Sequence, residues 1–529
     1  MHLLFPGRHH LLTDFQFKYL NQLIQTELLN VSDVEGNSLQ QSKVESVIFA
    51  VTSANHSNTR RNPLPFYLRA LAIEDFARDL NVPVYIFGID DVGKLEDFAS
   101  YTIKKIKHES DGLLNLNATN CAVICSTPVM QMYQQHGFRI LPAELNVQSN
   151  SFDAEQPWDL VEHIAKTPEW SADGFTLNKV HTSSYKIWKR YQLGSKVQLL
   201  FNDHIIGEDG DLTATRDYNS YVRQMDEIAE MKYHDTSEYI RQGRIGDIGC
   251  AVGSWIKLAS KDERFRESDF FGIEVSRHLF DICQQRKHNG EFANPYVFFA
   301  QKNAVTGLVF EENSMNCIFT SSLTHEIESY GGRQDLLNFI SNRFSELAPS
   351  GVWVNRDVVG PENGDKIVYI KLNKQDGVNE NSDGDFATRN ELTVYLDGLS
   401  TYGRFLRFAV DFRKKEGYKL EYKEEIINDE SYIKLSLSDA CEFMSRKDYT
   451  DNWESEMHET FTFWSFEDWK SHLEEVGFTV MPTSSAYTND WIVQNRLIGK
   501  CELFEMGGDT LKPMNYPVTN MLMIAEKKI

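Results

Sequence analysis

The sequence predicts an α/β protein made of two Rossmann-like, doubly wound domains in tandem. Strand-like apolar runs alternate with helix-like segments across residues 2–192, and the same alternation starts again near residue 243. This rhythm is typical of parallel sheets covered by helices on both faces. The turn-rich stretch "GEDGDLTATRD" (207–217) separates the two halves. We therefore expect domains at 1–205 and 206–529. The second would have a core at about 240–360 and an insertion or substrate region at about 361–465.

In the first half, short runs rich in Val, Ile and Leu predict buried strands, and apolar residues at helical spacing predict helices. Pro65 suits the first turn of one helix and Gly137 ends another. The expected strands are 2–5, 44–51, 82–89 and 121–126, and the expected helices are 65–80 and 129–137.

The second half repeats the pattern with a glycine-rich turn near its start. The segment 465–478 reads as a late helix that ends at Gly477, followed by a last strand at 519–528. Before it we expect strands at 244–250, 269–275, 296–301 and 315–322, and helices at 254–260 and 277–287.

The net charge of the chain indicates which classes of partner to expect. The 529 residues carry a formal charge of −23, whereas proteins that grip long nucleic acids usually present a basic surface. Small-molecule substrates and a nucleoside triphosphate are the expected partners. Short basic segments at 59–61 and 186–190 leave a small RNA in a local groove open as an alternative.

Cysteine usage and hydropathy favour a cytoplasmic protein without a membrane partner. The seven cysteines are scattered and form no CxxC pair, which fits buried thiols in a reducing compartment and gives no thiolate zinc site. No apolar run reaches about 18 residues, so no transmembrane helix is expected. The first residues, "MHLLFPGRHH", lack the features of a signal peptide.

The central loop "GRIGDIGCAVGSWIKLA" (243–259) has the chemistry of a cofactor site. Asp247 ends a strand, and Gly249 and Gly253 follow it at D-x-G-x-x-x-G spacing, which differs from the dinucleotide fingerprint G-x-G-x-x-G. Glu274 ends the next strand and could accept hydrogen bonds from two vicinal ribose hydroxyls. Asn303 follows the third strand, where it could touch an adenine edge.

This set resembles the class I S-adenosylmethionine-dependent methyltransferases. "DIGCAVGSW" is similar to their first motif and "GIEVS" (272–276) to their second. The resemblance implies a seven-stranded sheet with insertions, S-adenosyl-L-methionine as the cofactor, and methyl transfer to an unidentified acceptor. It implies cofactor binding by Asp247, Gly249, Cys250, Ala251, Gly253, Glu274 and Asn303.

Polar residues after the fourth strand are candidates for catalysis. His325 and Glu326 lie in "FTSSLTHEIESYGG" (319–332), where His325 could act as a general base. Ordinary helix capping accounts for the same residues equally well, and methyl transfer often needs only in-line positioning. A divalent metal shared with His458 and Glu459 is a further alternative. We favour simple packing there and assign no metal.

The loop "PGRHHLLTDF" (6–15) places clustered histidines between a strand and a helix, where phosphate groups are readily held. Together with "NPLPFYLRALAIEDF" (62–76) and "HTSSYKIWKR" (181–190), it resembles the nucleotidyltransferase superfamily that includes nicotinamide-mononucleotide adenylyltransferases and cytidylyltransferases. Those enzymes carry an H-x-G-H motif. This chain has His10 and Thr13 at that spacing, with Thr in place of the second His and no glycine between them.

The resemblance implies nucleotidyl transfer from a nucleoside triphosphate to a phosphorylated small molecule, with Mg²⁺ bridging the phosphates. His10 and Thr13 would be catalytic. The leading interpretation is therefore a bifunctional transferase, and the alternative is a methyltransferase with an inert nucleotide- or RNA-binding front module, in which Thr13 only caps a helix. The implied nucleotide-binding residues are Gly7, Arg8, His10, Thr13, Arg69, Ser183, Ser184, Lys186 and Arg190.

Overall fold

The computed structural model divides the chain into two compact units, Met1–Gly210 (the front unit) and Asp211–Ile529 (the second unit). The expected boundary between residues 205 and 206 lies outside the described residues. The structure describes residues 1–93, 95, 97–126, 129–146, 151–202, 218–380, 384, 386–508 and 510–528. Among these residues, no helix is both long and apolar enough to cross a membrane.

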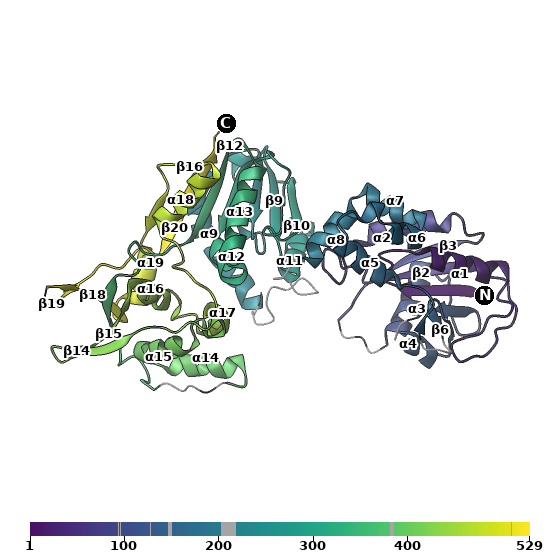
Figure 1. Ribbon diagram of the computed structural model, residues 1–529, viewed down its shortest axis with the longest axis horizontal. Coiled ribbons are helices and arrows are strands. Elements are labelled where there is room, and N and C mark those ends of the chain that lie inside the picture. The colour runs from purple at the N-terminus through teal and green to yellow at the C-terminus, as the bar shows by residue number, and fades with distance from the viewer. Residues whose placement is uncertain are drawn as a thin grey trace. The chain divides into compact units, whose positions relative to one another are not determined.

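The front unit contains a five-stranded, fully parallel sheet in the order β3-β2-β1-β4-β5. Figure 1 labels β2 and β3 of this sheet. The order reverses beside β1, because β2 and β4 lie on its two sides. All four strands expected from the sequence are present. The bounds are β1 (His2–Gly7), β2 (Ser46–Thr52), β3 (Val84–Ile89), β4 (Cys121–Ile124) and β5 (Arg139–Leu141).

Helices cover both faces of this sheet. Alternate residues of β2 point to opposite faces, so that Val47 and Phe49 join one core and Ile48 and Ala50 the other. The first core is closed by α1 (Asp14–Gln25) and α2 (Phe66–Ala77), and the second by α3 (Phe98–Glu109) and α4 (Met130–Gln135).

A helical group follows the sheet and packs on α2 through a third core that includes Trp170 and Trp188. It begins after a short two-stranded ladder, β6 (Leu145–Asn146) and β7 (Ser151–Phe152). Its members are α5 (Pro157–Lys166), η1 (Trp170–Ala172), α6 (Gly174–Lys179), α7 (Thr182–Arg190) and α8 (Leu193–Phe201).

The second unit is built on a mixed sheet in the order β10-β9-β8-β11-β12-β20-β16, with β17 also paired to β20. The strands from β10 to β12 are parallel, and β20 runs opposite to them. The bounds are β8 (Arg244–Ile248), β9 (Asp269–Glu274), β10 (Val297–Gln301), β11 (Met315–Ser321), β12 (Leu347–Val358), β16 (Phe478–Val480), β17 (Ser485–Tyr487) and β20 (Asn520–Lys527).

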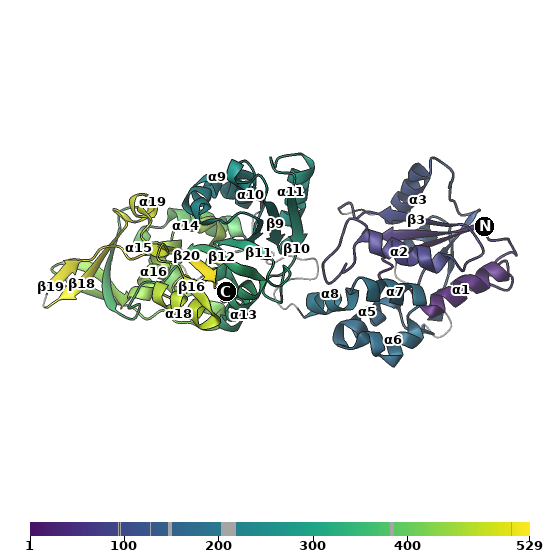
Figure 2. The same ribbon diagram turned by 90° about the horizontal axis from the view of Figure 1, so that it is seen from above.

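Two layers of helices enclose this sheet, as Figure 2 shows. On one face Trp255 and Cys283 pack against strand residues such as Phe319, and on the other Phe339 and Trp469 pack against Trp353. The first layer contains α9 (Tyr218–Thr236), η2 (Ser237–Tyr239), α10 (Ser254–Ala259), η3 (Glu263–Phe265) and α11 (Arg277–His288). The second contains α12 (Thr324–Gly331), α13 (Arg333–Glu346) and α18 (Phe466–Val476).

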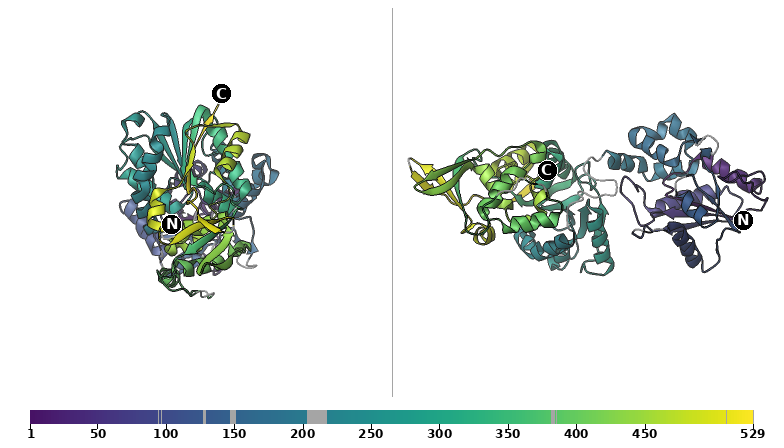
Figure 3. Two further views of the ribbon diagram at one scale, coloured as in Figure 1. Left: turned by 90° about the vertical axis from the view of Figure 1, so that its left-hand side faces the viewer. Right: turned by 90° about the horizontal axis from the view of Figure 1, so that it is seen from below.

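A separate antiparallel sheet in the second unit, β14-β15-β13-β18-β19, carries its own hydrophobic core, and we call it with its helices the inserted lobe (Figure 3). The sequence predicts an insertion at about 361–465 and misses the part near 490–513, which pairs with it through β18. The lobe comprises β13 (Ile367–Leu372), α14 (Arg389–Gly398), α15 (Thr401–Asp411), η4 (Lys414–Glu416), β14 (Lys423–Ile427), β15 (Glu430–Ser436), α16 (Leu437–Arg446), η5 (Thr450–Asn452), α17 (Trp453–Glu456), α19 (Asp490–Ile492), η6 (Val493–Leu497), β18 (Cys501–Gly507) and β19 (Thr510–Pro513).

A buried ion pair within α13 also holds the loop after β10. Arg343 and Glu346 are both fully buried, with Arg343 Nε donating to Glu346 Oε2 at 2.8 Å. Glu346 Oε1 also accepts the backbone N–H groups of Val309 and Phe310 at 2.6 and 3.1 Å. Glu346 therefore satisfies several donors that have no access to water.

Replacing Glu346 by alanine should lower the free energy of unfolding of the second unit by about 3–5 kcal/mol, because a buried guanidinium loses its partner. Denaturant unfolding followed by tryptophan fluorescence measures this loss. Glu312→Ala, at an exposed position nearby, is the control and should change stability by less than about 0.5 kcal/mol. Equal stabilities of the two variants would contradict the role assigned to Glu346.

Candidate cofactor and nucleotide sites

In the second unit, the carboxyl ends of β8, β9, β10 and β11 lie along one edge of the sheet, and β8 lies between β9 and β11. The chain therefore turns to opposite sides after neighbouring strands. In open α/β sheets this reversal opens a crevice where ligands bind. The glycine loop follows β8 directly, and Glu274 is the last residue of β9. The fold thus brings these two predicted features to one crevice.

The loop after β8 needs glycine for two reasons. Gly249 and Gly253 both have φ of +72°, a region that favours glycine. A Cβ on Gly249 would lie 3.1 Å from the Leu323 side chain, and one on Gly253 would lie 3.1 Å from the ring of Phe299. A larger residue at either position would thus strain the backbone and press on a neighbour.

Glu274 closes the glycine loop against β9. Its Oε2 accepts the backbone N–H of Ala251 at 2.9 Å, and its Oε1 accepts that of Ser276 at 2.8 Å. The carboxyl group is buried. Burial raises its pKa to about 7, although the two amide donors act in the opposite direction. Glu274 therefore has one hydrogen bond on each oxygen.

Asp247 lies in β8 just before the glycine loop, and Cys250 is part of the loop. Burial raises the pKa of Asp247 to about 8; the charge of Lys232 opposes this rise and that of Glu274 adds to it. The Cys250 thiol is buried beside Cys283, and burial raises its pKa well above the ordinary value. Cys250 thus contributes to the loop through its backbone N–H, which donates to Ile273 O at 3.1 Å.

Asn303 follows β10 and turns part of its amide toward its own loop, because its Oδ1 accepts the N–H of Val305 at 2.9 Å. Its side chain is half-buried. Next to Glu274, the Ser276 hydroxyl is buried and has no hydrogen-bond partner among the described residues. A buried polar group without a partner thus belongs to the residue whose N–H binds Glu274.

His325 lies between two carboxylates. Its Nδ1 is 2.6 Å from Asp357 Oδ1, and its Nε2 is 3.6 Å from Glu459 Oε2 in the inserted lobe. Burial lowers the pKa of His325, but the two carboxylates outweigh it and hold the pKa well above 6.5. The ring is thus a cation near neutral pH. This arrangement does not supply the uncharged imidazole nitrogen that a general base requires.

Asp357 explains the helix-capping alternative for the same segment. Its Oδ2 accepts the Thr324 N–H at 2.7 Å and the Thr324 hydroxyl at 2.6 Å at the start of α12. The cap is therefore supplied by β12, not by a residue of the loop itself. Glu326 is half-buried and lies close enough to raise the pKa of Glu274 through its charge.

The four residues considered for a metal are not gathered at one point. His458 forms an ion pair with Glu416, and its ring lies 4.8 Å from that of Tyr330. Tyr330 donates to Glu459 Oε1 at 3.4 Å. Within the described residues, no cluster of three or more His, Cys, Asp or Glu side chains is arranged to hold a metal ion.

In the front unit, Thr13 caps α1. Its Oγ1 accepts the Gln16 N–H at 3.1 Å, and its own N–H donates to Gln16 Oε1 at 3.2 Å, which together form a capping box. Thr13 is buried. The Thr13 hydroxyl is therefore engaged in the helix cap, and a phosphate contact by Thr13 stays a prediction.

The buried basic and hydroxyl residues of this unit mostly support the backbone. Arg69 donates to the carbonyls of Arg8, Thr52 and Ser53 at 2.8–3.0 Å. The Ser184 hydroxyl accepts the Leu12 N–H at 2.8 Å. The contacts with Arg8 and Leu12 hold the β1–α1 loop, and a contact of Arg69 or Ser184 with a triphosphate stays a prediction.

The other predicted nucleotide-binding residues differ in exposure. Ser183 is buried, and its hydroxyl pairs with His181 Nδ1 at 2.9 Å. Lys186 and Arg190 are exposed on α7. Gly7 ends β1, and a Cβ there would lie 3.1 Å from the His9 ring.

His10 is the residue of this loop that retains unused polar atoms. It is 4% exposed, and neither ring nitrogen makes a hydrogen bond of acceptable geometry among the described residues. Burial and the charges of Arg69 and Arg8 hold its pKa well below 6.5, while the Asn62 side chain acts in the opposite direction. Asn62 Oδ1 is also buried without a partner. The imidazole and the amide oxygen thus lie close to each other, and neither makes a hydrogen bond of good geometry within the described part of the chain.

Aromatic and cationic groups adjoin this pair. The Arg8 guanidinium lies 4.2 Å from the Trp158 ring centroid, and the His10 ring lies 6.1 Å from it. The sequence predicted His10 and Arg8 here but not Asn62 or Trp158. Asn62 opens the quoted "NPLPF" segment, whereas nothing in the sequence around Trp158 connects it to the first loop.

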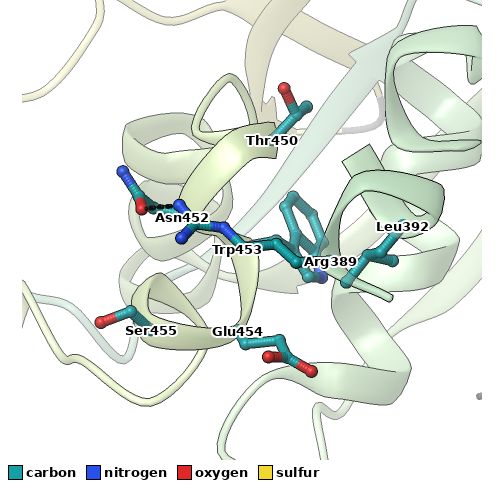
Figure 4. Close-up of a pocket in the computed structure, with 7 residues that line it drawn as sticks. All are labelled: Arg389, Leu392, Thr450, Asn452, Trp453, Glu454 and Ser455. Carbon is teal, nitrogen blue, oxygen red and sulfur yellow. Dashed lines mark hydrogen bonds between the residues drawn. The ribbon is translucent and has the colours of Figure 1, made fainter. Parts of the chain in front are cut away.

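The inserted lobe contains a small pocket. Figure 4 shows the Arg389 guanidinium turned toward Asn452, to which it donates a hydrogen bond. None of the residues predicted for a site lines this pocket. Its lining is Arg389, Leu392, Thr450, Asn452, Trp453, Glu454 and Ser455.

Comparison with known proteins finds solved structures that are similar to this chain. No protein-family model and no curated protein sequence match the chain. A methyltransferase from Mesorhizobium loti is 11% identical, with a TM-score of 0.31, over 57% of this chain and 99% of that one. Geranyl diphosphate C-methyltransferase from Streptomyces coelicolor is 10% identical, with a TM-score of 0.30, over 71% and 100%.

A third structure, a methyltransferase from Methanosarcina mazei, is 15% identical with a TM-score of 0.28, over 56% of this chain and 98% of that one. Scores of this size carry no conclusion about function. The proposed functions therefore rest on the geometry of the two candidate sites.

Replacing His325 by glutamine should lower the free energy of unfolding by about 1–3 kcal/mol near pH 6. The pKa of His325 is raised, so its contribution is fully present below about pH 6.5 and is lost as the pH rises through the folded-state value. The pKa of Asp357 is lowered, so its contribution is lost only in acid. The difference between wild type and variant should therefore narrow as the pH rises above 6.5 through the folded-state pKa of His325. Denaturant unfolding at several pH values measures it, and a pH-independent difference would contradict the ion pair.

Proposed function

We propose that the second unit is an S-adenosylmethionine-dependent methyltransferase that acts on a small-molecule acceptor. The observation that carries this proposal is the joining of the glycine loop to Glu274 by the Ala251 N–H at the reversal point of the sheet. This places a tight loop that begins and ends with glycine next to an acidic strand end. Sheet order and motif positions also agree with the resemblance seen in the sequence.

The side chains of the crevice fit this cofactor. Each Glu274 oxygen accepts one amide hydrogen and keeps further acceptor capacity, as two vicinal hydroxyls require. Gly249 and Gly253 let the loop turn tightly against the Leu323 and Phe299 side chains. The unsatisfied Ser276 hydroxyl offers one more polar contact. When bound, S-adenosylmethionine supplies an activated methyl group.

We propose that this chain contributes orientation and exclusion of water, and that His325 does not remove a proton from the acceptor. The ring is held as a cation between Asp357 and Glu459. It links the core of the unit to the inserted lobe, which also contacts α12 through Ser455 and Tyr330 at 3.0 Å. Holding two reactants in line supplies much of the rate increase that such a reaction needs. We place the acceptor between this edge and the inserted lobe.

Glu274→Ala should weaken S-adenosylmethionine binding by about 10- to 100-fold, which corresponds to the loss of hydrogen bonds to a charged group. Isothermal titration calorimetry of the full chain measures it. Glu267→Gln, at an exposed position before β9, is the matched control and should bind normally. Normal binding by Glu274→Ala would contradict the cofactor assignment.

A second function is favoured by the unsatisfied pair of His10 and Asn62 in the front unit. We propose that the front unit binds a nucleoside triphosphate there, with the neutral imidazole as a hydrogen-bond donor and the Trp158 ring close by. Arg8 would provide positive charge next to it. Nucleotidyl transfer to a phosphorylated small molecule, with Mg²⁺ held by the phosphates, is the reaction proposed, and an inert nucleotide-binding module is its alternative.

His10→Ala should reduce pyrophosphate release by about 100-fold, because a preorganised donor to developing charge is worth roughly 3 kcal/mol. The assay uses the full chain with Mg²⁺, each nucleoside triphosphate, and nicotinamide or nicotinate mononucleotide. His108→Ala, at an exposed position on α3, is the control. Triphosphate binding without any pyrophosphate release would favour the inert module, and the absence of binding would exclude both.

A further inference from the structure

The loop after β1 holds a histidine in a strained backbone conformation. His9 has a φ of +49°, in the left-handed region that residues other than glycine seldom adopt. Its Nε2 donates to Phe5 O at 3.0 Å, and its ring contacts the rings of Phe5 and Phe49 edge-on. The ring of the next residue, His10, lies instead near Trp158, at 6.1 Å. The strained turn therefore separates the two imidazoles.

Hydrogen bonds from two helices hold this loop on both sides of the two histidines. Before them, Arg69 of α2 donates to Arg8 O at 3.0 Å. After them, the Leu12 N–H donates to the Ser184 hydroxyl of α7 at 2.8 Å, and Leu12 O accepts the His181 N–H at 3.0 Å. A strained residue persists only where its surroundings fix the backbone in this way, and such residues are frequent at ligand sites.

The peptide of His10 itself is held by Trp188 of α7. The indole N–H of Trp188 donates to His10 O at 3.0 Å, although the two residues are 178 positions apart in the chain. Trp188 is fully buried and packs against Trp170, with ring centroids 6.0 Å apart. This hydrogen bond thus fixes the backbone of a residue whose ring nitrogens make no hydrogen bond of good geometry among the described residues.

We propose that Trp188 is a positioning residue for the nucleotide site of the front unit, because its indole N–H fixes the His10 peptide and so holds the imidazole beside Asn62 and Trp158. This inference rests on the proposed nucleotide binding by that unit, and Trp188 itself touches no ligand. Without the indole N–H, the His10 carbonyl would be buried without a donor. The loop would then move to reach water, and the imidazole would move with it.

The test removes the indole N–H and keeps an aromatic ring in the core. Trp188→Phe in the full chain should weaken binding of the nucleoside triphosphate that binds best by about 10-fold, as expected for a lost hydrogen bond. Isothermal titration calorimetry with ATP, GTP, CTP and UTP measures it. Trp170→Phe is the matched control, because Trp170 lies in the same core and its indole N–H makes no hydrogen bond in the described part of the chain. It should bind within about twofold of wild type.

A second measurement follows His10 without any ligand. Burial and the charges of Arg69 and Arg8 hold the pKa of His10 well below 6.5. Nuclear magnetic resonance of the histidine rings, assigned with His10→Gln, should show this pKa closer to 6.5 in Trp188→Phe, because the displaced ring gains water. The pKa should stay unchanged in Trp170→Phe. A role of Trp188 in packing alone would lower the unfolding temperature and leave the His10 titration as it is in the control.

The outcomes separate this inference from the proposed function. If wild type binds none of the four triphosphates, the nucleotide function fails, and the His10 titration still tests the positioning. If wild type binds one and Trp188→Phe matches Trp170→Phe in affinity and in the His10 titration, the inference is wrong while the function stands. Thermal unfolding shows whether each variant is folded, and Trp188→Met, which also lacks a donor, replaces Trp188→Phe if the latter is not.

Discussion

The hydrogen bond from the Ala251 N–H to Glu274 is the contact on which the second unit's candidate site depends. It joins the loop after β8 to the end of β9 across the point where the sheet order reverses. Because Gly249 and Gly253 have positive φ, the loop can turn tightly enough to bring that N–H to the carboxylate. The same contact leaves acceptor capacity on Glu274 facing the crevice. The Glu274 side chain therefore both holds the loop and offers acceptors to a ligand.

A second polar connection links this crevice to the inserted lobe. His325 lies between Asp357 of the core sheet and Glu459, and the buried Asp357 also caps α12. A buried imidazolium flanked by two carboxylates is stable only while all three remain together. The lobe is thus held by a charge arrangement at the edge where the acceptor is proposed to lie, which explains a histidine in this position without assigning it proton transfer.

In the front unit, the loop at the carboxyl end of β1 is held by a different set of hydrogen bonds. A hydrogen bond from Arg69 and one accepted by Ser184 hold the β1–α1 loop, and the capping box of Thr13 fixes the start of α1. These contacts leave the His10 ring and the Asn62 oxygen buried and unsatisfied. Since buried polar groups normally find partners, this pair is the feature of the loop that most favours a ligand.

The sequence by itself determined the two α/β sheets, the order of their strands and helices along the chain, and the positions of the glycine loop, Glu274 and His10, because alternating apolar segments and glycine spacing are local properties. The roles of Thr13, Arg69 and His325 were decided only by the tertiary structure. A threonine before a helix suits both a cap and a phosphate contact, and only the position of Gln16 distinguishes them. Asp357 and Asn62 come from segments distant in the chain from the residues they contact, and so do the strands of the inserted lobe near residue 501. Such pairings depend on how the sheets order their strands in space, which no local pattern of residues encodes.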